Sequence, residues 1–344
     1  MGNTCSPRVP NKPPPRFLGY NSGPNFEICH VCNRNIERWD NLRQLTFWGF
    51  KFCKMHEVDG TPRCSGCYRF QTEGQMEYVN LGDGRKLCLD CYSIAILDPS
   101  KCNRLIEKMR EFYKELNLEV DKDIPILLVD KDYMDKRGAI GLTTFDHRKV
   151  WTITNWSRNG NNIQVQKAKK ALTKAKVSSI LLLFGMPDVI MGAILAHEMM
   201  HAWLILKGCK KLDRKVCEGI CEVMAHLWLE WFCDEGKNNL DSYTTEQAEF
   251  TKILKIIHAY KMTTRVDKIY GDGFREAQRA LFQGITKEMA ASKSFILLLA
   301  SLLIVDTVSA FAPAPPPNAA VATDFVEIIA ASASAAPPPD EWLR

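Results

Sequence analysis

The chain has 344 residues, of which 25% are charged and 46% are hydrophobic. This length corresponds to about two domains of ordinary size, and the balanced composition excludes a fully disordered chain, a collagen and a continuous coiled coil. The net charge of +5 is too small to indicate a nucleic-acid-binding protein. The most informative feature is the distribution of the 13 cysteines, because most of them lie between Cys29 and Cys91.

The N-terminal sequence resembles an acylation signal. The segment MGNTCS at residues 1–6 places Gly2 where N-myristoylation occurs, and Cys5 is a candidate for palmitoylation. Two acyl chains, or one chain with basic residues, hold a protein at a membrane, so this interpretation predicts a cytoplasmic protein in peripheral contact with a membrane. The alternative is that residues 1–24 are a disordered, proline-rich leader in which the match arises by chance.

The C-terminal residues 289–344 differ in pattern from the rest of the chain. An apolar run of about 11 residues lies within residues 289–312, which is short of the roughly 20 residues needed to span a bilayer. Three interpretations remain open: a buried helix, a weak tail anchor, or a foreign reading frame joined to the gene model near Met289. We favour the third, because the run is laid out like a secretory signal and the Ala/Pro-rich remainder has no core-forming pattern.

The clustered cysteines form two similar sets of four metal ligands. In each set a Cys-x2-Cys pair is followed after 20 residues by a second pair, Cys-x2-His in the first set and Cys-x2-Cys in the second. Two such pairs complete a tetrahedron around Zn²⁺, whereas disulfides are disfavoured because no N-terminal signal peptide is evident. Closed four-ligand sites leave no open position for catalysis, so both zinc ions are interpreted as structural. The predicted ligands are Cys29, Cys32, Cys53 and His56 for one ion, and Cys64, Cys67, Cys88 and Cys91 for the other.

Two sequential sites of this kind resemble a LIM-type module, and such modules mostly bind proteins. Aromatic residues between the paired ligands suit small zinc-held hairpins, and His30 inside the first pair is expected to be exposed. Residues 25–100 lack a dense basic patch, which argues against nucleic acid as a partner. We therefore predict a LIM-like double zinc module over residues 25–100.

The following region combines helical and strand-like segments. Apolar spacing predicts a helix at 101–118, apolar runs predict strands at 124–129 and 177–184, and residues 138–165 have a strand-like pattern. The five lysines between Lys167 and Lys176 are interpreted as the solvated face of a helix. Asp188 is expected to be the N-cap of the next helix, which Gly208 ends.

That helix carries the motif His197-Glu198-Met199-Met200-His201. Its two histidines are four residues apart, so they share one face of the helix and can bind one zinc ion. Glu198 is the candidate catalytic residue, a general base that activates water for attack on a peptide carbonyl. These polar residues would be costly in an apolar helix without a partner, so the motif predicts a catalytic zinc site.

A helix predicted from Asp213 to Phe232 offers the third ligand. Glu218, Glu222 and His226 are spaced by four and share a face. In the similar gluzincin arrangement, a glutamate of the following helix binds the metal and an acid four residues later supports a ligand histidine. This assigns Glu218 as ligand and Glu222 as the support, with Glu222 as ligand as the alternative.

His226 is either a transition-state donor beside the site or a core histidine. Two cysteines flank this face and are interpreted as packing residues, Cys217 and Cys221.

Five segments carry a more specific likeness. They are HEVDGTPRC at 56–64, LGDGRKLCLDC at 81–91, HEMMHAWL at 197–204, EGICEVMAHLWLE at 218–230 and YGDGFR at 270–275. Together they resemble the plant ubiquitin-activated peptidases that limit organ growth, which are LIM-containing members of a zinc metallopeptidase family. The resemblance extends over about residues 25–285. It implies an α+β fold in which the LIM-like module precedes a gluzincin-like metallopeptidase domain. This domain extends over residues 101–288 and contains the HExxH helix. It also implies His197, His201 and Glu218 as ligands and Glu198 as the catalytic residue.

This resemblance implies a zinc-dependent endopeptidase that cleaves intracellular regulatory proteins of the ubiquitin pathway and limits cell proliferation and organ growth. It implies one catalytic and two structural zinc ions, with protein substrates, ubiquitin and ubiquitin ligases as partners. Compared with full-length members, we expect a truncated chain without the ubiquitin-interacting motifs and the first LIM domain. The segment at 135–176 also departs from the pattern, where a substrate-binding edge strand is expected. These departures keep an alternative open, a catalytically weak LIM-type adaptor or decoy.

Overall fold

The computed structural model describes residues 27–36, 42–120, 123–145, 149–172, 176–209, 212–237 and 239–288. The acylation candidates Gly2 and Cys5, and the C-terminal segment 289–344, lie outside the described residues. The chain divides into two compact units, with the boundary after Gly60. This boundary falls between the two cysteine clusters, whereas the sequence prediction placed both clusters in one module.

The first unit consists of short strands joined by tight turns. β1 (Glu27–Ile28) pairs with β2 (Asn35–Ile36), and β3 (Leu42–Leu45) pairs with β4 (Phe50–Cys53), both antiparallel. Within residues 27–36 and 42–60, the described part of this unit, the buried apolar residues are few: Cys29, Val31, Ile36 and Phe52. A core this small supplies little hydrophobic stabilisation, so a metal cross-link is expected to hold the unit together. Short 3-10 turns complete it, η2 (Thr46–Trp48) and η3 (Lys54–Glu57).

The second unit joins the second cysteine cluster to a helical body. β5 (Val79–Asn80) pairs with both β6 (Lys86–Leu87) and β11 (Asn162–Ala171), and β7 (Ala95–Ile96) pairs with β13 (Met186–Pro187) directly before the apolar helix α4 (Asp188–Leu206). These pairings explain why the second cluster belongs to this unit and not to the first. The elements of the unit are β5 (Val79–Asn80), β6 (Lys86–Leu87), α1 (Leu89–Ser93), β7 (Ala95–Ile96), α2 (Pro99–Glu115), β8 (Ile126–Val129), α3 (Lys131–Asp135), β9 (Gly141–Thr144), β10 (Lys149–Asn159), β11 (Asn162–Ala171), β12 (Ser179–Leu183), β13 (Met186–Pro187), α4 (Asp188–Leu206), α5 (Arg214–Phe232), η4 (Glu235–Lys237), α6 (Thr245–Thr264) and α7 (Tyr270–Glu288).

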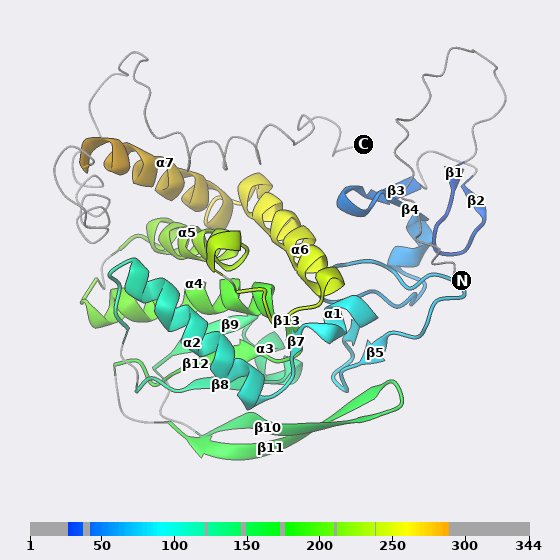
Figure 1. Cartoon of the computed structure of the whole chain (residues 1–344), viewed down its shortest axis with the longest axis horizontal. Coiled ribbons are helices and arrows are strands. Elements are labelled where there is room, and N and C mark those ends of the chain that lie inside the picture. The colour runs from blue at the N-terminus through cyan, green and yellow to red at the C-terminus, as the bar shows by residue number, and fades with distance from the viewer. Residues whose placement is uncertain are drawn as a thin grey trace, which may run out of the picture. The chain divides into compact units, whose positions relative to one another are not determined.

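A three-stranded sheet in the order β8-β12-β9 supports α4. The central strand β12 is buried along its whole length, runs parallel to β8 and is antiparallel to β9. Figure 1 shows the hairpin β10-β11 on one side of this sheet and the helices α4, α5 and α7 on the other. The predicted strands at 124–129 and 177–184 are confirmed as β8 and β12.

The prediction of a helix face for the lysine run was wrong. Lys167, Lys169 and Lys170 lie in β11, which pairs antiparallel with β10 over almost its whole length. Neighbouring pairing decides this segment, because Lys169 lies opposite Trp151 and its ammonium group sits 5.4 Å from the centre of the indole ring. A tight turn at Gly160, where φ is +58°, lets the chain reverse between the two strands.

Helix α4 is apolar on nearly all sides and forms the core of the second unit. It is long and apolar enough to cross a membrane by composition, but 72% of its most apolar window is buried inside the protein. Pro187 occupies the N-cap position, so the expectation that Asp188 is the N-cap was wrong by one residue. The helix ends as predicted at Gly208, whose φ of +84° is the left-handed conformation that glycine favours.

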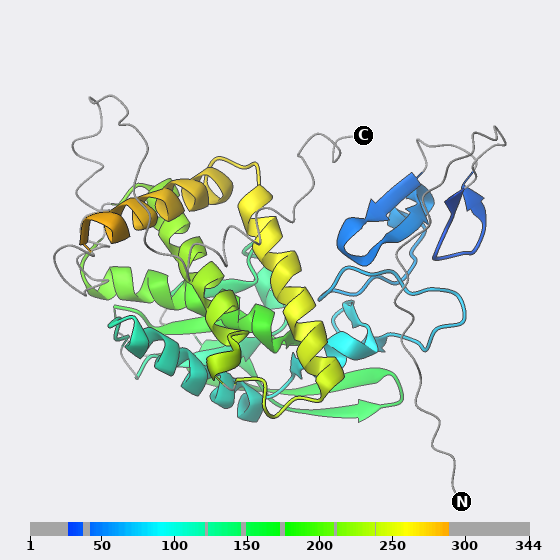
Figure 2. The ribbon, with the colours of Figure 1, turned by 45° about the horizontal axis from the view of Figure 1, so that its top comes forward.

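Helix α5 packs between α4 and α7 at two glycines. A Cβ atom on Gly192 of α4 would lie 2.2 Å from the indole nitrogen of Trp228, and one on Gly219 of α5 would lie 2.3 Å from the carbonyl oxygen of Gly273. Both helices therefore approach α5 closely only because these positions lack a side chain. Figure 2 shows the yellow helix α6 extending from α7 towards α1, the helix that carries Cys91.

Candidate metal centres and active site

The first cysteine cluster lies within the first unit. Its four potential ligands lie within 4.8 Å of one another: Cys29, Cys32, Cys53 and His56. The backbone N–H groups of Val31 and Cys53 each donate to Cys29 Sγ at 3.4 Å. Burial raises the pKa of the Cys29 thiol, but such backbone hydrogen bonds outweigh it and lower the pKa to about 7. His56 Nδ1 lies 2.8 Å from Asp59 Oδ2, a contact that orients the ring so that Nε2 would be the nitrogen to bind a metal.

The second cysteine cluster is fully buried in the second unit. Its four sulfur atoms also lie within 4.8 Å of one another: Cys64, Cys67, Cys88 and Cys91. Cys67 Sγ and Cys88 Sγ are 3.6 Å apart, close to the spacing of about 3.8 Å expected for thiolates on a tetrahedral zinc ion with bonds of about 2.3 Å. All four residues are free cysteines, so the structure fits the predicted zinc ligation and not a disulfide.

A partly buried arginine lies beside the second cluster. Arg69 donates from Nε to Cys67 Sγ at 3.3 Å and from Nη2 to Cys88 Sγ at 3.4 Å. Asp90 accepts a further hydrogen bond from Nη2 at 2.5 Å and fixes the guanidinium group. The positive charge favours the thiolate form that a metal requires. Arg69 was not singled out from the sequence, because only the fold brings it to the sulfur atoms.

Three ligand atoms converge between α4 and α5. His197 Nε2 lies 3.1 Å from His201 Nε2, and Glu218 Oε2 lies 3.2 Å from the first nitrogen and 3.3 Å from the second. Ligands on a tetrahedral zinc ion with bonds of about 2.0–2.1 Å are separated by about 3.3 Å. The three residues therefore fit a zinc ion as they stand.

The outer nitrogens of the two rings face supporting groups. His197 Nδ1 lies 3.8 Å from Glu222 Oε1, and His201 Nδ1 lies 3.5 Å from Cys217 Sγ. Metal-binding histidines usually bond through their other nitrogen to an acceptor of this kind. Both imidazoles thus present Nε2 to one point. The interpretation of Cys217 as a packing residue missed this contact.

Cys221 is a competing ligand at the same point. Its sulfur lies within 4.8 Å of the ligand nitrogens of both histidines, so a His197–His201–Cys221 set is also possible by distance. Burial raises the pKa of the Cys221 thiol well above its usual value, which favours the protonated form. Burial also raises the pKa of Glu218, but hydrogen bonds to His197 and His201 outweigh it and lower that pKa to about 2. Glu218 is therefore the charged group at this point, 3.2 and 3.3 Å from the two nitrogens.

Glu198 is held beside this cluster by the edge strand β9. The N–H group of Thr143 donates to Glu198 Oε2 at 2.7 Å, and Thr143 Oγ1 lies 2.8 Å from the same oxygen. Gly141 allows the close approach, because a Cβ atom there would lie 2.5 Å from Ile194 and 2.9 Å from Glu198. Thr143 was not predicted from the sequence, since nothing local links it to a helix 55 residues away.

His226 lies farther along α5, in contact with α7. Its ring packs against Phe274 with the ring centres 5.5 Å apart, and burial lowers the pKa of the imidazole. The charged groups that act on it are Glu230 and Lys255. The structure thus places His226 in the packing between helices, as the core-histidine alternative expects, and its predicted role beside the metal stays a prediction.

Comparison with known proteins identifies the family. The sequence profile of the DA1-like family, described as Protein DA1, matches residues 115–290, about half of the chain. The chain belongs to the DA1 family. The resemblance inferred from the five segments is thereby confirmed.

Members of the DA1 family match the chain well beyond that profile. Protein DA1 of Arabidopsis thaliana is 33% identical over 293 residues, which cover 77% of this chain and 55% of the relative. Protein DA1-related 1 of the same plant is 34% identical, covering 76% and 52%, and the LIM domain-containing protein HDR3 of Oryza sativa subsp. japonica is 33% identical, covering 74% and 58%. The chain spans about half the length of these curated relatives. No solved structure matches it significantly.

The comparisons and the structure bear out the coarser part of the predicted fold. The protein is a mixed α/β structure whose Cys/His clusters can hold zinc, within a family that includes a LIM domain-containing protein. The number of zinc ions and the residues that bind them stay predictions.

Proposed function

We propose that this protein is a zinc-dependent peptidase with a gluzincin-like catalytic domain. The observation that carries the proposal is the convergence of His197 Nε2, His201 Nε2 and Glu218 Oε2 on one point, with Glu198 beside them. Two imidazoles and one carboxylate, with the remaining position open, are a donor set of catalytic zinc sites. When bound there, zinc polarises a substrate carbonyl and makes water a better nucleophile.

The protein residues divide the remaining work. Glu198 accepts the proton of the attacking water and passes it to the leaving amine. Thr143 fixes the Glu198 carboxylate through its N–H and hydroxyl groups, so little orientational freedom is lost when the reaction begins. Cys217 contacts the His201 ring through Sγ and Nδ1, and the Glu222 carboxylate lies within ion-pair distance of His197 Nδ1, which favours the ring orientation that points Nε2 inward.

Strand β9 supports a mode of substrate binding. In the described sheet it is an edge strand that pairs with β12 on one side, and it carries Thr143 next to Glu198. An extended peptide can add to such an edge through backbone hydrogen bonds, which would lay its scissile bond across the cluster. This placement is part of the proposal.

The biological role follows from the family. We propose that the substrates are intracellular regulatory proteins of the ubiquitin pathway, that ubiquitin and ubiquitin ligases are partners, and that cleavage limits cell proliferation and organ growth. One catalytic and two structural zinc ions are proposed per chain.

A cytoplasmic location with membrane contact through acylated Gly2 and Cys5 is also proposed. Gly2→Ala should then move the protein from the membrane to the soluble fraction.

The two cysteine clusters favour a second candidate function. Closed zinc sites of this kind commonly stabilise modules that bind other proteins, so the chain could act as a catalytically weak adaptor or decoy. Its zinc content would equal that of the peptidase. Only cleavage separates the two functions.

The deciding experiment measures self-cleavage and substrate cleavage by the zinc-loaded full chain, with and without prior ubiquitination. Wild type is compared with Glu198→Gln and with Glu111→Gln, which makes the same chemical change on the exposed side of α2. Glu198→Gln should keep three zinc ions by metal analysis and lose at least a hundredfold in rate, because the general base is removed. Glu111→Gln should cleave like wild type.

Two results would decide against the proposal. Cleavage by Glu198→Gln at the wild-type rate would reject the peptidase mechanism. If wild type binds its partners with three zinc ions but cleaves nothing in either ubiquitination state, the adaptor function replaces it.

A further inference from the structure

A pocket lies between α2, the start of α4 and the start of α6, outside the metal centres. Its volume is about 280 Å³, slightly below the range of about 300–1,000 Å³ typical of pockets for drug-sized ligands. It has room for one small ligand. Its lining includes Lys101, Arg104, Lys108, Asp188, Phe232 and Tyr243, all from the second unit.

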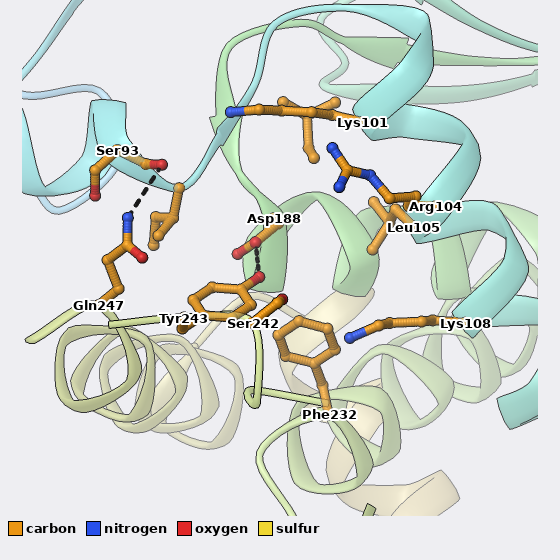
Figure 3. A pocket seen from close by; sticks show the side chains of 12 residues that line it. Ser93, Lys101, Arg104, Leu105, Lys108, Asp188, Phe232, Ser242, Tyr243 and Gln247 are labelled. Carbon is orange, nitrogen blue, oxygen red and sulfur yellow. Dashed lines mark hydrogen bonds between the residues drawn. The ribbon is translucent and has the colours of Figure 1, made fainter. Parts of the chain in front are cut away.

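Three cations of α2 face this pocket. Lys101, Arg104 and Lys108 are spaced by three and four residues, so they share one face of the helix, and Figure 3 shows all three side chains extending from α2 along this pocket. Within the described part of the chain, none of them forms an ion pair with a carboxylate. Lys101 Nζ donates to the carbonyl oxygen of Ala95 at 3.2 Å, and Lys108 Nζ donates to that of Asn239 at 2.5 Å.

This arrangement differs from that of lysines elsewhere in the unit. Several of them form ion pairs with glutamates at 2.5–2.7 Å: Lys215 with Glu276, Lys237 with Glu115, and Lys255 with Glu230. In the pocket, the two lysines donate to backbone carbonyl groups instead, and a partly desolvated ammonium group without an ion pair costs energy. Burial accordingly lowers the pKa of Lys108. A bound anion would remove this cost.

One acid opposes the three cations. Asp188, the first residue of α4, lies at the pocket wall and accepts a hydrogen bond from the hydroxyl group of Tyr243 (Figure 3). Glu111 and Asp241 act on Lys108 but do not line the pocket. Three cations against one carboxylate leave two positive charges in the lining, and the positive ends of α4 and α6 add to this field.

We propose that this pocket binds a phosphate monoester, carried by a small molecule or by a phosphorylated side chain of a peptide. Such a group carries a charge of about −1.5 to −2 at pH 7 and three strong acceptor oxygens. The guanidinium group of Arg104 suits bidentate binding of two of these oxygens, and the two lysines supply further donors. The partly exposed ring of Tyr243 offers an apolar surface to the organic part of the ligand, whereas Phe232 is buried and lies 5.2 Å from the ammonium group of Lys108. This site is independent of the proposed peptidase reaction.

The test measures binding to the zinc-loaded full chain by calorimetry at fixed ionic strength. The probes are phosphoserine, a phosphoserine-containing peptide, inorganic phosphate and, as controls, serine and sulfate. Arg104→Ala is the main variant, because this exposed residue has no ion pair in the described structure and its loss should leave the fold intact. Lys114→Ala removes one positive charge from an exposed position of the same helix that does not line the pocket.

We expect phosphoserine or its peptide to bind where serine does not, and Arg104→Ala to weaken binding at least tenfold while Lys114→Ala changes it less than twofold. Binding of the peptide alone would assign the ligand to a protein partner, and equal binding of free phosphoserine would assign it to a small molecule. Absence of binding by every phosphate probe, equal binding of sulfate, or equal weakening by the two variants would overturn the proposal. Thermal unfolding of Arg104→Ala at the wild-type temperature confirms that the variant is folded.

Discussion

Replacing Gly192 by alanine tests whether the close packing of α4 on α5 holds the proposed metal ligands together. An added Cβ atom would lie 2.2, 2.3 and 2.4 Å from Nε1, Cε2 and Cζ2 of Trp228. Favourable contacts between heavy atoms begin near 3.5 Å, so the ring must retreat by about 1 Å. Trp228 is fully buried, and its indole N–H donates to the carbonyl oxygen of Val189 at 3.2 Å, so it has little room to move.

The change in the free energy of unfolding caused by Gly192→Ala follows from three effects. Overpacking a close-packed core costs about 1–3 kcal/mol, and loss of the hydrogen bond to Val189 costs about 1 kcal/mol. Alanine in a helix interior is favoured over glycine by about 1 kcal/mol, which opposes both. We expect Gly192→Ala to lower the free energy of unfolding by about 1–3 kcal/mol. α4 carries both histidines and α5 carries Glu218. A wider spacing between these helices should therefore also weaken zinc binding at the proposed catalytic site.

Urea unfolding at saturating zinc measures the first effect, and metal analysis at limiting zinc measures the second. Trp228→Met provides the matched background, because it removes the three ring atoms that the new methyl group meets and replaces them with a flexible side chain. In that background Gly192→Ala should be neutral or stabilising. If Gly192→Ala leaves stability unchanged in the wild-type background, or costs the same in both backgrounds, the packing argument is wrong.

Three further predictions concern charge, the structural metals and the catalytic base. Burial raises the pKa of Asp188 from 3.8 to about 6, so its contribution to stability is complete below pH 4 and is lost as the pH rises to about 6. In urea unfolding of the metal-free proteins, the free energy of unfolding of wild type should fall by up to about 3 kcal/mol relative to that of Asp188→Asn over this pH interval. The same pH dependence in both proteins would contradict the raised pKa of Asp188. Cys91→Ser should lower the melting temperature of the second unit, while Cys53→Ser should remove one zinc ion and leave that temperature unchanged; equal effects would refute this division. Thr143→Val keeps the backbone donor to Glu198 but removes the hydroxyl group, so kcat should fall about tenfold with KM little changed. Thr143→Ser should restore kcat, and a rise in KM with kcat unchanged would argue against a positioning role.

Local sequence rules explain much of the fold. Asp98 accepts hydrogen bonds from the first backbone N–H groups of α2, and Pro99 occupies the first turn of that helix. Gly208 follows the end of α4. The start of α2 and the end of α4 therefore lie close to the positions expected from the sequence. The apolar runs at β8 and β12 gave strands of the predicted type. The lysine run of β11 had no such local signal, because its strand state depends on pairing with β10.

The candidate site likewise combines features that local sequence predicts with features that depend on packing. Spacing alone placed His197 beside His201 on one helix face, and equal spacing within the two cysteine sets predicted two closed clusters, because the backbone geometry of a helix or a tight turn fixes neighbours three or four residues apart. Spacing could not separate Glu218 from Glu222, since both lie on the same face of α5. The packing of α5 on α4 favours Glu218 as the predicted ligand, as it brings Glu218 to 3.2 Å from His197 Nε2 and leaves Glu222 near Nδ1.

The sequence by itself therefore determined which residues could bind zinc, because ligand type and short-range spacing are local properties. Only the tertiary structure decided what surrounds them. Thr143 reaches Glu198 from a strand 55 residues away, Arg69 reaches two cysteine sulfurs across the second cluster, and three cations of α2 meet Asp188 in one pocket. These contacts join segments that are distant in the chain, so the packing of helices and strands creates them and no local pattern records them.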